Sequence, residues 1–175
     1  NTDEGSELLR HAVAGCLAAM HDSTLLFAPH FNSYERLVPD KHAPTAISWG
    51  YENRTTCFRL VGHDPGSLRV ENRLPGADTN PYLTAAATIA AGVAGILNQI
   101  EPEPEVIGSG YSQEPARDFA RSMPEAISRL RASDFARDWL GPRFVDGFSA
   151  TREAQHDEFR RKVPDVELHR FFDLG

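Results

Sequence analysis

Apolar residues recur at helical spacing near the start of the chain. Within residues 6–20 they lie three or four positions apart, so their side chains share one face of a helix. These positions are Leu9, Val13, Cys16, Leu17 and Met20. Ser6 precedes them and is a residue type that commonly caps helix N-termini. The pattern therefore predicts an amphipathic helix over residues 6–20, capped by Ser6.

The next segment, residues 27–44, contains three prolines and shows no regular apolar period. Prolines without periodicity are typical of a loop. Loops of this length inside compact domains are usually functional. We therefore expect functional residues in this segment.

Three short segments that resemble β-strands follow, at residues 45–51, 55–62 and 67–75. The joins at 52–54 and 63–66 are short and turn-like, which favours hairpin connections. The pattern predicts an antiparallel β-meander.

Helical patterns dominate the rest of the chain. Asn80 followed by Pro81 predicts a helix start, and the apolar run that follows predicts a buried helix to about Ile100. Residues 101–115 are predicted to form a loop. Three further helical stretches lie near residues 123–132, 134–140 and 143–162, before a short end at 167–175. The predicted fold class is α+β, an antiparallel β-meander flanked by helices.

Composition and charge exclude several classes of protein. The chain has 175 residues, enough for one ordinary domain, and its formal net charge of −7 argues against general nucleic-acid binding. The sequence has no P-loop, no Rossmann glycine motif and no zinc-ligand spacing. Cys16 and Cys57 lack a paired spacing and are expected to be buried, reduced thiols of a cytoplasmic protein that contacts no membrane.

One strand segment carries charges on alternate positions. Arg69, Glu71 and Arg73 share a face because successive strand side chains alternate. Three more arginines lie nearby in the sequence: Arg36, Arg54 and Arg59. Converging guanidinium groups repel one another unless an anion lies among them, and each can grip two oxygens of a phosphate or carboxylate. Two interpretations stay open, namely an anion-binding site and a solvated strand face held by salt bridges.

Glu71 also has two interpretations. It is either an ion-pair partner of the flanking arginines or an oxygen ligand of Mg²⁺ or Mn²⁺. Spacing alone does not decide between them.

Three ordered motifs carry a resemblance to a known family. "NSYERLVP" at 32–39, "ENRTTCFRL" at 52–60 and "RVENRLPGADTNPYL" at 69–83 resemble, in order and spacing, the C-terminal half of the catalytic domain of glutamine synthetases. The likeness covers essentially the whole chain. It implies an ATP-dependent ligase that makes γ-glutamyl phosphate from glutamate and ATP, after which an amine displaces the phosphate.

The resemblance assigns roles position by position. Arg36 and Arg73 match arginines that hold the substrate glutamate, and the match for Arg73 also contacts the γ-glutamyl phosphate. Arg54 matches an arginine that contacts ATP and stabilises the transferring phosphoryl group. Arg59 and Arg69 match arginines on the nucleotide phosphate side.

Two further positions carry expectations about metal and amine. Glu71 matches a ligand of a divalent metal ion. His42 stands where glutamine synthetases proper have a glutamate that closes over the ammonium site, and is a third candidate catalytic residue beside Arg54 and Arg73. An imidazole offers a small cation no negative charge, which favours a larger organic amine. Alternatively, His42 is an ordinary exposed loop histidine and ammonia is the substrate.

The segments around "SWGYENRT" and "GHDPGSLRVENRLPG" look more like the γ-glutamyl-polyamine and γ-glutamyl-amine ligase branch. The implied partners are glutamate, ATP, ammonia or an organic amine, and further copies of the chain in a ring, expected to be a dodecamer. In the family, an N-terminal β-grasp domain and other metal ligands precede this segment, so residues 1–175 are expected to be a C-terminal fragment that is inactive alone. A glutamate–ammonia ligase and a non-catalytic structural relative remain the alternatives.

Overall fold

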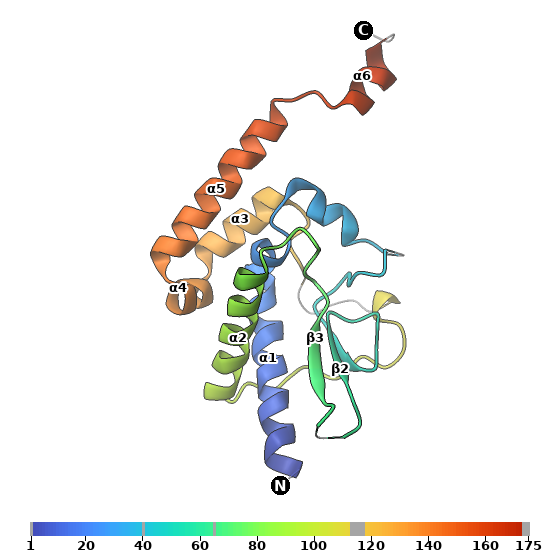
Figure 1. Ribbon diagram of the computed structural model, residues 1–175, viewed down its shortest axis with the longest axis vertical. Coiled ribbons are helices and arrows are strands. Elements are labelled where there is room, and N and C mark those ends of the chain that lie inside the picture. Colours follow the sequence, from blue (N-terminus) through green and yellow to red (C-terminus); the bar gives the residue numbers. More distant parts are fainter. Residues whose placement is uncertain (1, 40, 65, 113–117, 173–175) are drawn as a thin grey trace.

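The fold is seen in a computed structural model, which describes residues 2–39, 41–64, 66–112 and 118–172 (Figure 1). The helices are α1 (Thr2–Phe27), α2 (Pro81–Leu97), α3 (Met123–Ala132), α4 (Asp134–Leu140), α5 (Pro142–Arg160) and α6 (Asp165–Phe171). The strands are β1 (Trp49–Tyr51), β2 (Phe58–Val61) and β3 (Arg69–Asn72). Two short 3-10 helices are η1 (Phe31–Arg36) and η2 (Gly110–Ser112).

The predicted first helix is confirmed, but it is longer than expected. Val13, Cys16, Leu17 and Met20 are buried, as their spacing predicts. The helix begins at Thr2, so Ser6 lies inside it and is not its cap. No proline precedes Ser6 to prevent an earlier start.

Helices α1 and α2 lie side by side and cross at two glycines (Figure 1). A Cβ added at Gly15 would lie 2.2 Å from the carbonyl oxygen of Ala91. One added at Gly95 would lie 2.1 Å from the carbonyl oxygen of His11. No side chain fits at either distance, so the two glycines let the helix backbones approach closely.

The sheet has the order β1-β2-β3, and the predicted meander is only half right. β2 and β3 pair antiparallel, with Arg59 opposite Glu71. β1 and β2 instead pair parallel, with Trp49 opposite Phe58. The prediction that residues 52–54 form a hairpin turn is therefore wrong.

Residues 52–57 carry the chain back to the start of β1. Glu52 adopts a left-handed backbone with φ 47°. Asn53 then closes a local turn, because its side-chain oxygen accepts from the Thr55 N–H at 3.0 Å. A parallel connection normally needs a dozen or more residues. Here β1 has three residues and spans only about 10 Å, so a short return suffices.

Helix α2 begins as predicted. The Asn80 side chain accepts from the N–H groups of Tyr82 and Leu83, and Pro81 occupies the first turn. The prediction of a buried helix holds for one face only. Only the face with small residues is buried, whereas the opposite face exposes apolar side chains. The exposed ones are Tyr82, Ile89, Val93 and Leu97.

Helices α3, α4 and α5 follow their predicted ranges closely, whereas α6 was not predicted. α3 and α4 match residues 123–132 and 134–140, and α5 matches 143–162 to within two residues at either end. α6 has no buried residue and lies at the far end of α5 (Figure 1). Among the described residues, no helix is long and apolar enough to cross a membrane.

Candidate active site

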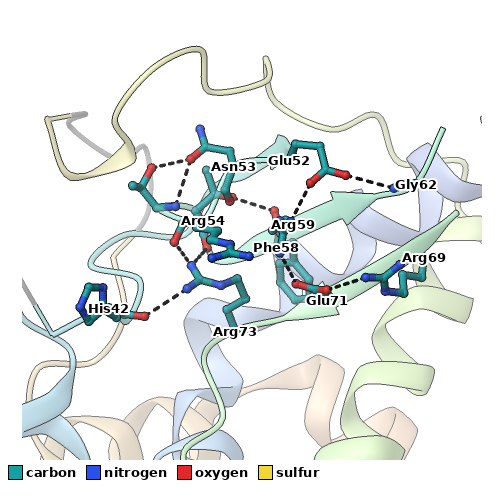
Figure 2. A network of polar contacts seen from close by, with 12 residues as sticks. His42, Glu52, Asn53, Arg54, Phe58, Arg59, Gly62, Arg69, Glu71 and Arg73 are labelled. Carbon is teal, nitrogen blue, oxygen red and sulfur yellow. Dashed lines mark hydrogen bonds and ion pairs between the residues drawn. The ribbon is translucent and has the colours of Figure 1, made fainter. Parts of the chain in front are cut away.

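The outer face of β2 and β3 carries a chain of ion pairs, which we call the carboxylate-paired group (Figure 2). Glu71 accepts from Arg59 Nη1 at 3.1 Å and from Arg69 Nη2 at 3.3 Å. Glu52, at the end of β1, accepts from Arg59 Nη2 at 2.6 Å. Arg59 is therefore shared between two carboxylates. Its contact with Glu52 is the main reason why the pKa of Arg59 is raised and that of Glu52 lowered.

The predicted alternation along β3 is confirmed. Glu71 and Arg69 meet on the outer face, whereas Val70 packs against the core and Leu74 is fully buried. Arg73 directly follows β3, and its backbone N–H donates to the Cys57 carbonyl at 2.9 Å. This bond extends the pairing of the two strands by one step.

Arg73 is held by backbone carbonyls (Figure 2). Its Nη1 donates to the carbonyl oxygens of Arg54 and Thr56, the latter at 3.2 Å. Its Nη2 donates to the carbonyl oxygen of His42 at 3.1 Å. Among the described residues, no carboxylate lies within 4.0 Å of this guanidinium.

Arg36 ends η1 and is held in a similar way. Its Nη2 donates to the carbonyl oxygen of Leu74, the residue after Arg73. Burial lowers the pKa of Arg36 first of all, and the nearby positive charge of Arg73 acts in the same direction, while Asp78 opposes both. The structure thus brings Arg36 and Arg73 within electrostatic reach of each other. We call these two the carbonyl-held arginines.

Arg54 lies on the exposed return loop beside Arg73. Within the described part of the chain, its guanidinium makes no hydrogen bond or ion pair. The loop itself is firmly fixed by Asn53, whose side-chain nitrogen donates to the carbonyl oxygens of Val106 and Gly108 at 3.1 and 2.9 Å. Thr55 adds a third tie, because its hydroxyl accepts from the Gly110 N–H at 2.7 Å.

His42 reaches the site through its backbone and not through its ring. The residue is exposed and has a left-handed φ of 55°. Its carbonyl oxygen is the acceptor for Arg73. Among the described contacts, none involves the imidazole, so the geometry leaves both interpretations of this histidine open.

Glu71 is the one predicted metal ligand, and its chemistry fits a hard divalent cation. Both of its oxygens contact arginines in this structure. Among the described residues, no group of three His, Cys, Asp or Glu side chains is close enough to hold a metal ion. Glu71 is thus suited to be one ligand of a site that needs further oxygens.

The two cysteines are free and buried, as predicted. Burial raises the pKa of Cys16 to about 12, and it also raises the pKa of Cys57. Neither thiol is therefore activated for catalysis.

The sequence analysis missed three residues that shape the site: Glu52, Asn53 and Thr55. Asn53 lies in the quoted "ENR" motif, where an asparagine after a strand indicates a turn. Nothing local in the sequence indicates that Glu52 reaches across to β2.

Comparisons with known proteins place the chain in a family. The glutamine synthetase catalytic-domain model matches residues 1–171, and the chain belongs to this family. It is 42% identical over 169 residues to the γ-glutamylethanolamide synthetase GlnA4 of Streptomyces coelicolor, covering 96% of this chain and 36% of that protein. It is 34% identical over 171 residues to the glutamate–isopropylamine ligase of a Pseudomonas species, covering 97% and 37%.

A solved structure of GmaS without ligand superimposes with a TM-score of 0.79 at 26% identity. The match covers 95% of this chain and 38% of that one. The chain therefore spans somewhat more than a third of the length of these relatives.

Proposed function

We propose that these residues act in an ATP-dependent ligase that joins the γ-carboxyl group of glutamate to an organic amine. The observation that carries the proposal is the convergence of Arg36, Arg54 and Arg73, none of which has a carboxylate partner among the described residues. Three neighbouring positive charges, none of them in an ion pair among the described residues, favour a bound anion. The names of the relatives, an ethanolamide synthetase and an isopropylamine ligase, support an amine as the second substrate.

The chemistry requires such a site because it brings anions together. The γ-carboxylate of glutamate attacks the γ-phosphorus of ATP, which yields γ-glutamyl phosphate and ADP. The neutral amine nitrogen then attacks the acyl carbon, phosphate leaves, and the nitrogen loses a proton. Positioning and charge stabilisation supply most of the rate enhancement in phosphoryl transfer.

We assign the arginine roles from the family match. Arg36 and Arg73 hold the glutamate, and Arg54 faces the transferring phosphoryl group. Arg59 and Arg69 lie on the nucleotide side. Because backbone carbonyls fix Arg36 and Arg73, these two can orient a carboxylate without first losing a salt bridge.

Glu71 would hold Mg²⁺ or Mn²⁺ together with ligands from outside these residues. A bound divalent cation would neutralise charge on the phosphate oxygens. We further propose that the chain is the C-terminal segment of the catalytic domain, and that the enzyme is a ring-shaped homo-oligomer. The 175 residues alone are then expected to show no ATP-dependent phosphate release with glutamate and any amine, and release by them would contradict the proposal that they are a segment.

The test is an amine panel on the longer protein that contains this sequence. Glutamate and ATP are kept fixed, phosphate release is followed, and ethanolamine, isopropylamine, a diamine and ammonia are compared by kcat/KM. We expect an organic amine to give the highest value. If ammonia does, the enzyme is a glutamate–ammonia ligase, and His42 is then an ordinary exposed loop histidine whose carbonyl oxygen holds Arg73. If no amine supports release although ATP binds, the protein is a non-catalytic relative.

A further inference from the structure

Glu52 lies outside every assigned role, yet the structure holds it in a defined place. Its left-handed φ of 47° is uncommon for a residue with a side chain. Its backbone N–H donates to the Leu60 carbonyl at 2.9 Å, which fixes this conformation against β2. The turn therefore directs the Glu52 side chain across the neighbouring strand β2, where it is still 40% exposed.

Both carboxylate oxygens of Glu52 are engaged. Oε2 accepts from Arg59 Nη2 at 2.6 Å, and Oε1 accepts from the Gly62 N–H at 3.3 Å (Figure 2). Arg59 is the second residue of β2, and Gly62 directly follows the strand. A carboxylate tied at both oxygens has little freedom, so it can in turn fix the guanidinium that it contacts.

Arg59 depends on such fixing. Its side chain is only 14% exposed, and its buried Nε has no partner among the described residues. The two terminal nitrogens donate to Glu52 and Glu71, and the contact with Glu52 is the shorter. The orientation of this guanidinium is therefore set by two carboxylates.

Under the proposed function, one of those two carboxylates has a second task. Glu71 cannot direct the same oxygens fully to a cation and to Arg59 and Arg69 at once. Any shift of Glu71 towards a cation weakens its hold on Arg59. Glu52 has no such competing role, so its grip on Arg59 persists in both states.

We propose that Glu52 is a positioning residue, which holds Arg59 in place so that this arginine meets the nucleotide phosphates while Glu71 serves the metal. This inference rests on the proposed function. The inference concerns nucleotide affinity, whereas the proposed function concerns the amine. Each can therefore be contradicted without the other.

The test is Glu52→Gln in the longer protein, with ATP binding measured apart from turnover. Binding of ADP in the presence of Mg²⁺ is followed by calorimetry, and KM for ATP and kcat are measured with the best amine of the panel. We expect ADP affinity to fall about tenfold and KM for ATP to rise by a similar factor, because a hydrogen bond to a charged group is lost. We expect kcat to change less than about twofold, since no group that contacts the reacting atoms is altered.

Glu105→Gln is the matched control. Glu105 lies at the same corner of the sheet, where it accepts from the Tyr51 N–H at 2.6 Å, and within the described ranges it makes no hydrogen bond or ion pair with an arginine. Glu105→Gln removes the same charge at a neighbouring place but leaves Arg59 held. The ADP affinity of this variant should therefore equal that of the wild type. Equal losses of ADP affinity in Glu52→Gln and Glu105→Gln would overturn the proposal. They would show that the removed charge or a disturbed local structure, and not the contact with Arg59, weakens ADP binding.

A double-mutant cycle with Arg59→Ala decides whether Glu52 acts through Arg59. We expect Glu52→Gln to cause no further loss of ADP affinity when Arg59 is absent. Independent losses would overturn the proposal, as would unchanged or tighter ADP binding by Glu52→Gln alone. Tighter binding would show that Glu52 competes with the phosphates. ADP calorimetry remains informative if no amine supports turnover, which separates this inference from the proposed function.

Discussion

Arg59 lies on β2 and Arg73 directly follows β3, yet different kinds of group hold their guanidinium groups. Arg59 donates to the carboxylates of Glu52 and Glu71. Arg73 donates to the carbonyl oxygens of Arg54, Thr56 and His42. Both arginines are well ordered by hydrogen bonds, but only one is neutralised.

This difference separates two uses of arginine in one site. A carboxylate offsets part of the positive charge it contacts, so an arginine between two carboxylates attracts a further anion less strongly than an arginine without a carboxylate partner. A backbone carbonyl orients the guanidinium but leaves its net charge intact. The carbonyl-held arginines are therefore the better anchors for substrate anions, and the carboxylate-paired group is the better framework for a metal and a nucleotide.

The structure thus favours a different interpretation for each part of the charged stripe. The salt-bridged strand face describes Arg59, Arg69 and Glu71 as they lie here. The absence of a carboxylate partner within the described residues sets Arg73 apart and favours an anion-binding role for it.

Removing Arg73 should have the largest effect. We expect Arg73→Ala in the longer protein to lower kcat by about 10²- to 10³-fold, the usual cost of losing a charged contact to the reacting group. Arg73→Lys should restore little, because an ammonium group cannot reach three carbonyls in a fixed fork. The measurement is kcat at saturating substrates, with the urea unfolding midpoint as the check on folding. Full activity, or a loss matched by unfolding, would mean that Arg73 only braces the loop.

Glu71→Gln tests the metal side of the comparison. We expect the affinity for Mn²⁺ to fall at least about tenfold. Substitution of a residue that only hydrogen-bonds to a metal ligand commonly lowers metal affinity by that factor, and loss of a ligand itself should cost no less. Titration of the longer protein with Mn²⁺, followed by electron paramagnetic resonance, measures this without turnover. Glu105→Gln again serves as the matched control. If both variants bind Mn²⁺ as the wild type does, Glu71 is only an ion-pair partner of Arg59 and Arg69.

His42→Glu tests whether the backbone or the side chain of this residue matters. A carboxylate there would attract a small cation by about 1 kcal/mol or more, so kcat/KM for ammonia should rise about fivefold. Use of the preferred organic amine should not improve. His42→Gln keeps the carbonyl contact with Arg73 and adds no charge, so it should leave ammonia use unchanged. If neither substitution changes ammonia use, the side chain of His42 has no part in amine selection. An equal rise in both would show that loss of the ring, and not the added charge, is the cause.

Arg69→Ala should have the smallest effect. Its side chain is 58% exposed and meets Glu71 at 3.3 Å, and such surface pairs contribute between zero and about 1 kcal/mol. We therefore expect KM for ATP to rise no more than about fivefold, with kcat unchanged. A loss as large as that of Arg73→Ala would remove the distinction between the two groups of arginines.

The sequence by itself determined the features that depend on neighbouring residues. Strand alternation placed Arg69 and Glu71 on one face and Leu74 on the other, because the period of a strand is a property of its own backbone. Asn80 and Pro81 determined the start of α2 for the same local reason. The family motifs then predicted which arginines belong to the site.

Only the tertiary structure decided how distant segments meet. The parallel pairing of β1 with β2, the reach of Glu52 to Arg59, and the ties from Asn53 to Val106 all depend on where the chain returns in space. The exposed face of α2 is a second case, because an apolar run has the same composition whether or not a neighbour covers it. The carboxylates and carbonyls that contact each arginine come from other segments of the chain. A local sequence pattern does not determine the distance between these groups and the guanidinium.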